Sequence, residues 1–170
     1  MKEKGVPHRL HLFGTYEAPV GMEYDRYLYK PKPDQLREFY NEVDFWIAPT
    51  KKEGLHIPPQ EAMLCGCILI GTGGKAIKED YELSGMHDYL TPNKTGFTIT
   101  QPDRAVAIIR KFHTVKEARY RLEQISEAGK DRIRGLGNRE INMERMVQLF
   151  EKVIEKMKPG GIGNGGLFDG

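Results

Sequence analysis

The sequence has few of the features that mark secreted, metal-binding or membrane-embedded chains. It has only two cysteines, Cys65 and Cys67. A Cys-x-Cys pair is a poor disulfide, and no further His or Cys at ligand spacing completes a metal site. We therefore predict that both are small core residues in a reducing cytoplasm and that the chain binds no metal.

Long apolar runs and a targeting segment are also missing. No run approaches the ~20 residues of a spanning helix, and the first nine residues, MKEKGVPHR, do not have the pattern of a signal peptide. We predict a soluble, cytoplasmic chain. Peripheral contact with the inner membrane surface is the most membrane association that the sequence allows.

The charge balance argues against nucleic acid as a partner. The chain has 26 basic and 24 acidic residues and a net charge of +2, and no dense Lys/Arg block occurs. Alternating charges are typical of solvated faces rather than of a phosphate-binding surface. With 170 residues, 39% of them hydrophobic, the chain suits one globular domain.

Short apolar runs alternate with helical patterns in the first hundred residues. Strands are predicted at residues 9–14, 27–29, 45–48, 68–70 and 96–99. Helices are predicted from an Asp34 cap and from Pro58-Pro59 to Gly66, where proline opens the helix and glycine closes it. A glycine-rich turn is predicted at residues 71–74. This alternation predicts an α/β fold with a Rossmann-like open, mostly parallel sheet flanked by helices.

Three further helices are predicted after the last strand. The first buries Ala105, Ile108, Ile109 and Phe112, and the second opens with a capping box from Thr114 to Glu117. The third has a stripe at helical spacing that predicts a core face. Its members are Met143, Met146, Val147, Phe150, Val153, Ile154 and Met157. Residues 159–170 are glycine-rich, and we expect a disordered tail.

Residues 48–67 hold the groups best suited to chemistry. Glu53 is predicted in the loop after a strand and Glu61 in the first turns of the next helix, with the glycine-containing stretch 54–57 between them. Carboxylates bind sugar hydroxyls, and loop amides beside a helix N-terminus suit a diphosphate. The combination predicts a nucleotide-sugar pocket, whereas either glutamate alone is more typical of an ordinary surface helix.

This segment resembles the glutamate-x7-glutamate motif of family 4 retaining glycosyltransferases, which have the GT-B fold. The matching residues are Pro49, Thr50 in place of serine, Glu53, Gly54, Pro58, Glu61, Ala62, Met63 and Gly66. The flanks resemble the family as well, at Leu36, Tyr40, Asp44, residues 71–74 and residues 95–97.

The resemblance implies a role for each matching residue. Glu53 would be catalytic, orienting the transferred sugar near its anomeric centre, and Glu61 would hold the ribose hydroxyls. Gly54, Leu55, His56 and Ile57 would offer backbone amides to the sugar or diphosphate. Tyr29 and Lys30 would lie beside the base. A catalytic base is the alternative role for His56.

The resemblance also implies which groups the reaction needs. Front-face attack uses no enzyme nucleophile, so the lack of a Ser-His-Asp arrangement is no objection. The absence of an Asp-x-Asp pair fits a metal-independent enzyme without a cofactor.

The family's complete enzymes have two domains. We expect residues 1–158 to be the C-terminal, donor-binding domain without its first strand-helix unit, which carries an Arg/Lys pair in the family. The implied partners are a UDP- or GDP-linked sugar, a saccharide or lipid-linked acceptor, and the absent N-terminal domain. We expect a role in polysaccharide biosynthesis and no transfer by this fragment alone.

Two other interpretations stay open at this point. The chain could be a non-catalytic Rossmann-like binding or interaction module, although a module without activity need keep neither glutamate. A dinucleotide-binding domain fits less well, because Gly71-x-Gly73-Gly74 lacks the full glycine spacing and the acidic residue that follows it.

Overall fold

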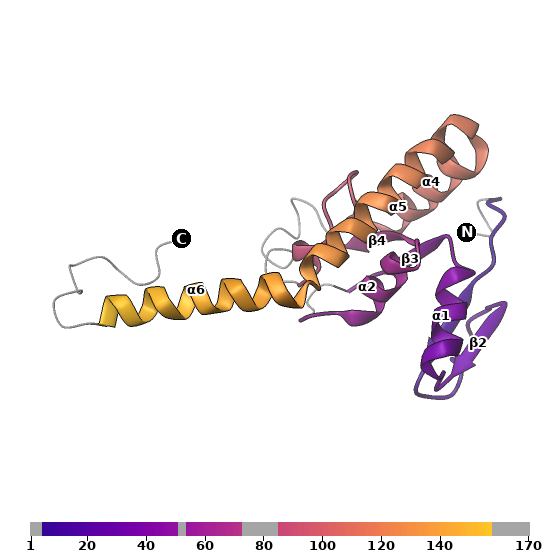
Figure 1. Cartoon of the computed structure of the whole chain (residues 1–170). Coiled ribbons are helices and arrows are strands. Elements are labelled where there is room, and N and C mark those ends of the chain that lie inside the picture. Colours follow the sequence, from indigo (N-terminus) through magenta and orange to yellow (C-terminus); the bar gives the residue numbers. More distant parts are fainter. Residues whose placement is uncertain (1–4, 51–53, 73–84, 158–170) are drawn as a thin grey trace. The chain divides into compact units, whose positions relative to one another are not determined.

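The structure is a computed structural model that describes residues 5–50, 54–72 and 85–157. The chain divides into two units, residues 1–134 and 135–170. The first is an α/β unit, and Figure 1 labels several of its helices and strands. In chain order they are β1 (His11–Gly14), β2 (Arg26–Tyr29), α1 (Pro33–Asn41), β3 (Phe45–Ala48), α2 (Ile57–Leu64), β4 (Ile68–Thr72), the 3₁₀ helix η3 (Gly85–Asp88), β5 (Gly96–Ile99), α4 (Pro102–Thr114) and α5 (Lys116–Leu136).

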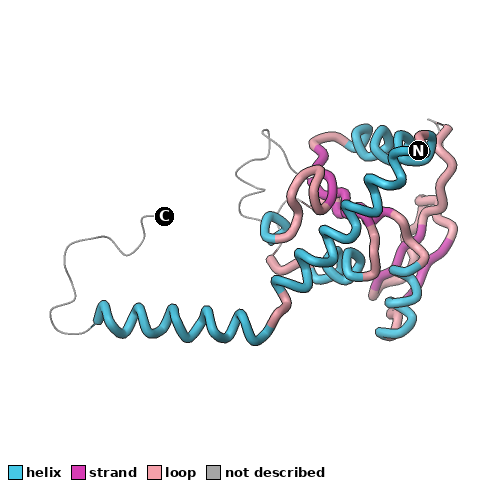
Figure 2. Tube along the Cα trace, turned by 45° about the horizontal axis from the view of Figure 1, so that its top comes forward, coloured by secondary structure: helices cyan, strands magenta, loops and turns pink. Residues whose placement is uncertain are grey.

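Every strand pair in the first unit is parallel, as the sequence predicts. The strands form a two-stranded sheet, β1-β2, and a three-stranded sheet, β3-β4-β5, with β4 in the middle. Figure 2 shows the strands among the helices of this unit. The predicted bounds of β3 and β5 are confirmed, whereas β4 runs on to Thr72, so that Gly71 is part of the strand and not of a turn. Gly73 and Gly74 lie outside the described residues.

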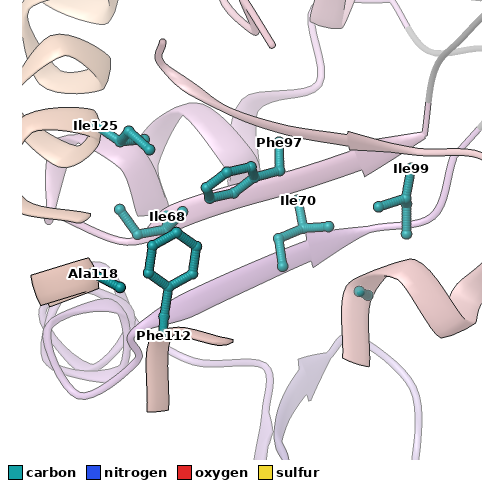
Figure 3. Close-up of a cluster of buried hydrophobic side chains, with 8 residues drawn as sticks. Ile68, Ile70, Phe97, Ile99, Phe112, Ala118 and Ile125 are labelled. Atoms are coloured by element: carbon teal, nitrogen blue, oxygen red, sulfur yellow. The ribbon is translucent and has the colours of Figure 1, made fainter. Parts of the chain in front are cut away.

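Strand β4 lies at the centre of the larger core. Ile68 and Ile70 are buried with Phe97 and Ile99 of β5 against helices α4 and α5. The rings of Phe97 and Phe112 lie 5.4 Å apart between their centroids, and Figure 3 shows them beside Ile68. The other members of this cluster are Ala105, Ala118 and Ile125. The predicted inner face of α4 is thus confirmed.

A second cluster joins the two sheets under α1 and α2. Phe39 and Tyr40 of α1 are buried with Ala62 and Cys67, and Phe13 of β1 and Trp46 of β3 are among the residues packed against them. The thiol of Cys67 lies 3.2 Å from the carbonyl of Tyr40. Burial raises the pKa of this thiol to about 12. Cys67 is a core residue as predicted, whereas Cys65 is half-buried.

Two predicted helix starts are wrong. Helix α1 begins at Pro33 after the cap residue Lys32, not at an Asp34 cap, and the Gln35 side chain accepts a 2.9 Å hydrogen bond from the Lys32 amide. Thr114 does not cap α5, because it ends α4 and donates backwards to the Arg110 carbonyl at 2.9 Å. The predicted end of α2 is correct, since Gly66 follows it with φ +98°.

The second unit contains α6 (Arg139–Met157), whose apolar stripe is not the core face that the sequence predicts. None of the described residues of α6 is buried, and its large apolar side chains are 37–75% exposed. The helical spacing is present, but within this unit no described residue covers the stripe. In the parts of the chain that the structure describes, no helix combines the length and apolarity needed to cross a bilayer.

Candidate functional site

The carboxyl ends of β3 and β4 lie side by side in the parallel sheet. Ala48, the last residue of β3, is buried, and the Thr72 hydroxyl at the end of β4 donates to the Thr50 carbonyl. The hydroxyl of Thr50 is itself enclosed and has no hydrogen-bond partner among the described residues. Ligands of open α/β sheets bind at this edge, so the segment after β3 is correctly placed for a site.

Glu53, the predicted catalytic residue, lies outside the described residues, and the described part of the loop starts at Gly54. Gly54 and Leu55 are exposed, and His56 has left-handed backbone angles, φ +46° and ψ +69°. A non-glycine residue in this region costs about 1–3 kcal/mol and is over-represented at binding sites. The strained residue immediately precedes the first turn of α2.

The start of α2 offers few amides of its own. His56 is its cap residue and Ile57 its first residue, followed by Pro58 and Pro59, which carry no N–H. Two of the four donors that a helix N-terminus normally leaves unpaired are therefore absent. Any anion bound here would depend on the amides of the stretch 54–57 more than on the helix.

Two residues of the 85–89 region hold this loop in place. An added Cβ at Gly85 would lie 1.8 Å from the Gly54 carbonyl oxygen, so the two backbones touch. The Tyr89 hydroxyl donates to the His56 carbonyl at 3.5 Å. Neither contact is predicted by the sequence, because neither glycine spacing nor aromatic content identifies a segment about thirty residues away as the neighbour.

Glu61 is positioned by a tyrosine from another helix. The buried Tyr40 hydroxyl on α1 donates to Oε2 of Glu61 on α2 at 3.0 Å. Burial, and then the hydrogen bond to Glu61, raise the pKa of Tyr40 far above its ordinary value, so this hydroxyl stays a donor at physiological pH. A carboxylate held by one oxygen can still accept hydrogen bonds from a ligand.

Tyr29 and Lys30 lie at the carboxyl end of β2. Tyr29 is 54% exposed, and the Lys30 ammonium lies 5.0 Å from the centroid of its ring. Lys30 also has a positive φ, +44°. Among the described residues no hydrogen bond or ion pair joins this pair to α2 or to Glu61.

Metal-ligating side chains do not gather in the described residues. No group of three or more His, Cys, Asp or Glu there could hold a metal ion.

Comparisons with known proteins give one similar structure and one matching family model. Among solved structures, the chain is similar to the C-terminal domain of a glycosyl transferase group 1 family protein (LpcC) from Francisella tularensis, with 17% sequence identity and a TM-score of 0.46. The match covers 64% of this chain and 51% of that chain, so it spans about half of that protein's structure. No curated protein matches the sequence. The model of one family, described as glycosyl transferase-like, matches residues 1–150, and the chain belongs to the glycosyl transferase-like family.

Proposed function

We propose that this chain binds the nucleotide-sugar donor of a retaining glycosyl transferase with a GT-B architecture, and that residues 1–158 form its donor-binding domain. The donor is a UDP- or GDP-linked sugar, and the acceptor is a saccharide or a lipid-linked saccharide. The proposal rests on membership of the glycosyl transferase-like family and on the chemistry of the groups after β3.

The observation that carries the proposal is the hydrogen bond from Tyr40 to Glu61, which joins α1 to α2. A carboxylate on the first turns of a helix, fixed by a buried hydroxyl, is preorganised to accept two hydrogen bonds from a ribose diol. The neighbouring loop 54–57 supplies backbone amides for the diphosphate. In this arrangement Tyr29 and Lys30 contact the base from the end of β2.

Transfer needs a catalytic group and a second domain. We assign the catalytic position to Glu53, which would orient the sugar hydroxyls beside the anomeric carbon. The leaving phosphate accepts the proton of the acceptor, so no protein nucleophile takes part. The acceptor binds to a partner domain that faces the donor site, since one half of a two-domain cleft cannot position both substrates.

Titration of the chain with UDP, GDP and their common sugar conjugates, followed by amide chemical shifts, tests donor binding. We expect shifts in residues 54–61 and dissociation constants on the order of high micromolar to millimolar. Glu61→Gln should weaken binding by about 1–3 kcal/mol, because it removes charge-assisted hydrogen bonds. Glu38→Gln, an exposed change on α1, is the matched control. The proposal would be overturned if no amide of residues 54–61 changed its chemical shift with any of the nucleotides.

A radiolabelled transfer assay tests the need for a second domain. We expect the purified chain to bind donor but to transfer no sugar, because an unneutralised leaving diphosphate alone costs about 10²–10³ in rate. Turnover that disappears in Glu53→Ala would refute the second-domain requirement and still support donor binding.

A further inference from the structure

Residues 85–95 form a well-packed segment that leads into β5, and we call it the support segment. Met86, Tyr89 and Leu90 are each 1% exposed, and the Leu90 amide donates to the Met86 carbonyl at 2.8 Å. An added Cβ at Gly71 of β4 would lie 2.3 Å from Sδ of Met86. The support segment therefore packs directly against the middle strand of the larger sheet.

The support segment contacts the loop 54–57 at two backbone carbonyls. The Gly54 carbonyl oxygen would lie 1.8 Å from an added Cβ at Gly85. The His56 carbonyl lies 3.5 Å from the Tyr89 hydroxyl, which donates to it. The two contacts hold alternate residues of the loop, so the position of the support segment determines how this part of the loop is oriented.

Holding these two carbonyls also sets the direction of two amides. A trans peptide unit is planar, and its C=O and N–H groups point in opposite directions. The Gly54 carbonyl shares a peptide unit with the Leu55 amide. The His56 carbonyl shares one with the Ile57 amide. Both N–H groups therefore point away from the support segment, and they belong to the stretch that we assign to the diphosphate.

A buried hydroxyl fixes the support segment from within. Thr95 is 4% exposed. Its Oγ1 donates to the Tyr89 carbonyl at 2.7 Å and accepts from the Thr91 amide at 2.7 Å. A threonine hydroxyl has one O–H to donate, so its donor is fully used here. The tyrosine whose hydroxyl reaches the loop is thus held at its backbone by Thr95.

A solvent-exposed hydrogen bond holds the same segment less firmly. Arg132 of α5 donates through Nε to the Asp88 carbonyl at 2.7 Å, but both residues are exposed. Water can replace an exposed hydrogen bond at little cost, whereas a buried amide or carbonyl that loses its partner stays unpaired. The geometry of the support segment therefore depends more on Thr95 than on Arg132.

We propose that Thr95 is a positioning residue of the donor site and acts on the loop 54–57 through the support segment. The inference rests on the proposed function, since it concerns the loop assigned to the diphosphate. Thr95 itself does not touch the ligand. Its hydroxyl fixes the support segment, the segment holds two loop carbonyls, and the amides of the same peptide units keep the direction that an anion needs.

This role requires a hydroxyl at position 95 rather than a particular side-chain shape. Valine has nearly the shape of threonine but no hydroxyl, so Thr95→Val leaves the Tyr89 carbonyl and the Thr91 amide unpaired in the core. Thr95→Ser keeps the hydroxyl and can form both hydrogen bonds. Comparison of the two variants therefore separates the effect of the hydrogen bonds from the effect of packing.

Amide chemical shifts of the free chain, followed by titration with UDP and GDP, test the proposal. In Thr95→Val we expect altered amide shifts at Leu55 and Ile57. The nucleotide dissociation constant should rise about three- to tenfold, because the two amides lose their preorganised direction. Thr95→Ser should resemble the unmodified chain in both measurements. The control is Ile125→Val, a change at a side chain in the larger core that is 2% exposed, which should lower stability without changing the loop.

Two results would overturn the proposal. One is unchanged amide shifts at Leu55 and Ile57 in folded Thr95→Val. The other is an equal loss of nucleotide affinity in Thr95→Val and Ile125→Val, because general destabilisation would then explain both. If the unmodified chain binds no nucleotide, the proposed function fails, and the shifts of the free chain still decide whether Thr95 positions the loop.

Gly85→Ala is the second variant, and it decides the outcome if Thr95→Val does not fold. It keeps both hydrogen bonds of Thr95 and disturbs only the contact with the Gly54 carbonyl, which an added Cβ would meet at 1.8 Å. We expect an altered Leu55 amide shift and a dissociation constant about three- to tenfold higher. Folded Gly85→Ala with the Leu55 shift and the affinity of the unmodified chain would overturn the proposal.

Discussion

The two sheets bury their strands to different extents. In β4, Ile68, Leu69 and Ile70 are at most 4% exposed, whereas every residue of β1 is half-buried. β4 has a strand on each side and helices packed against it, whereas β1 has a strand on one side only. Residue type therefore specifies that a segment can be buried, and the neighbours on its edges decide whether it is.

Between the two sheets, matched leucines give the largest expected difference in stability. Leu69→Ala in β4 should lower the free energy of unfolding by about 2–5 kcal/mol, because it leaves a cavity in a closed core. Leu12→Ala in β1 should cost about 1 kcal/mol, since that side chain is already partly solvated. Urea unfolding of both variants measures the difference. Equal losses would mean that the open edge of β1 is covered in solution.

Substitution of matched glycines in the two sheets should give the next largest difference in stability. An added Cβ at Gly96 of β5 would lie 2.6 Å from the Leu69 carbonyl oxygen, which is backbone and cannot move away. Gly96→Ala should cost about 1–3 kcal/mol. At Gly14 of β1 the nearest atom, 2.7 Å away, is the Tyr27 hydroxyl at the end of a side chain that can turn. Thermal unfolding should therefore show a smaller loss for Gly14→Ala, and the reverse order would contradict this comparison.

The raised pKa of Cys67, which lies in the cluster that joins the sheets, predicts a loss of stability at high pH. Its folded pKa of about 12 lies above the ordinary thiol value of 9.0. Because the pKa is higher in the folded state, the contribution of the Cys67 thiol to the free energy of unfolding is complete below about pH 9. This contribution is lost as the pH rises towards 12. At about pH 10.5 the loss should be about 2 kcal/mol. Cys67→Ala should flatten this part of the stability profile, and an unchanged slope would exclude the thiol as its cause.

Tyr40→Phe tests the contact that positions Glu61. Losing the hydrogen bond should cost about 0.5–1.5 kcal/mol of stability and weaken nucleotide binding about two- to tenfold. Tyr27→Phe, which removes a hydrogen bond to the Tyr16 carbonyl in the open sheet, is the control and should leave nucleotide binding unchanged. Calorimetric titration with the tightest-binding nucleotide measures the affinity of both variants. Equal losses of affinity would show that Tyr40 has no specific role in nucleotide binding.

The smallest expected effect is in α6. Phe150 is 57% exposed, whereas Phe112 of α4 is 8% exposed. Phe150→Ser should change the free energy of unfolding by no more than about 0.5 kcal/mol, and Phe112→Ala should cost about 3–5 kcal/mol. Denaturant midpoints of the two variants provide the measurement. A large loss at Phe150 would show that the apolar stripe of α6 is covered in solution.

Local signals predicted most of the fold. The bounds of β3 and β5 follow from apolar runs between turn residues, and Gly66 closes α2 because it can adopt a positive φ. Thr114 was misassigned because its hydroxyl can bond forward or backward within the same few residues. The stripe of α6 was misassigned because an amphipathic pattern states that one face is apolar but does not say what covers it.

The site was less accessible to sequence reasoning, because its contacts join distant segments. Glu61 was found from its spacing, but its partner Tyr40 lies 21 residues earlier on another helix. The contact of Gly85 with Gly54 depends on how two loops meet, and no periodicity records it.

The aromatic cluster that joins the two sheets has a consequence for cooperativity. β1 and β2 contact the three-stranded sheet through side chains, mainly Phe13 against Trp46 and the residues of α1, and not through backbone pairing. Side-chain contacts alone couple two segments less tightly than a continuous hydrogen-bonded ladder does. Within the first unit we therefore expect the segment from β1 to α1 to open at a lower free energy than β3, β4 and β5.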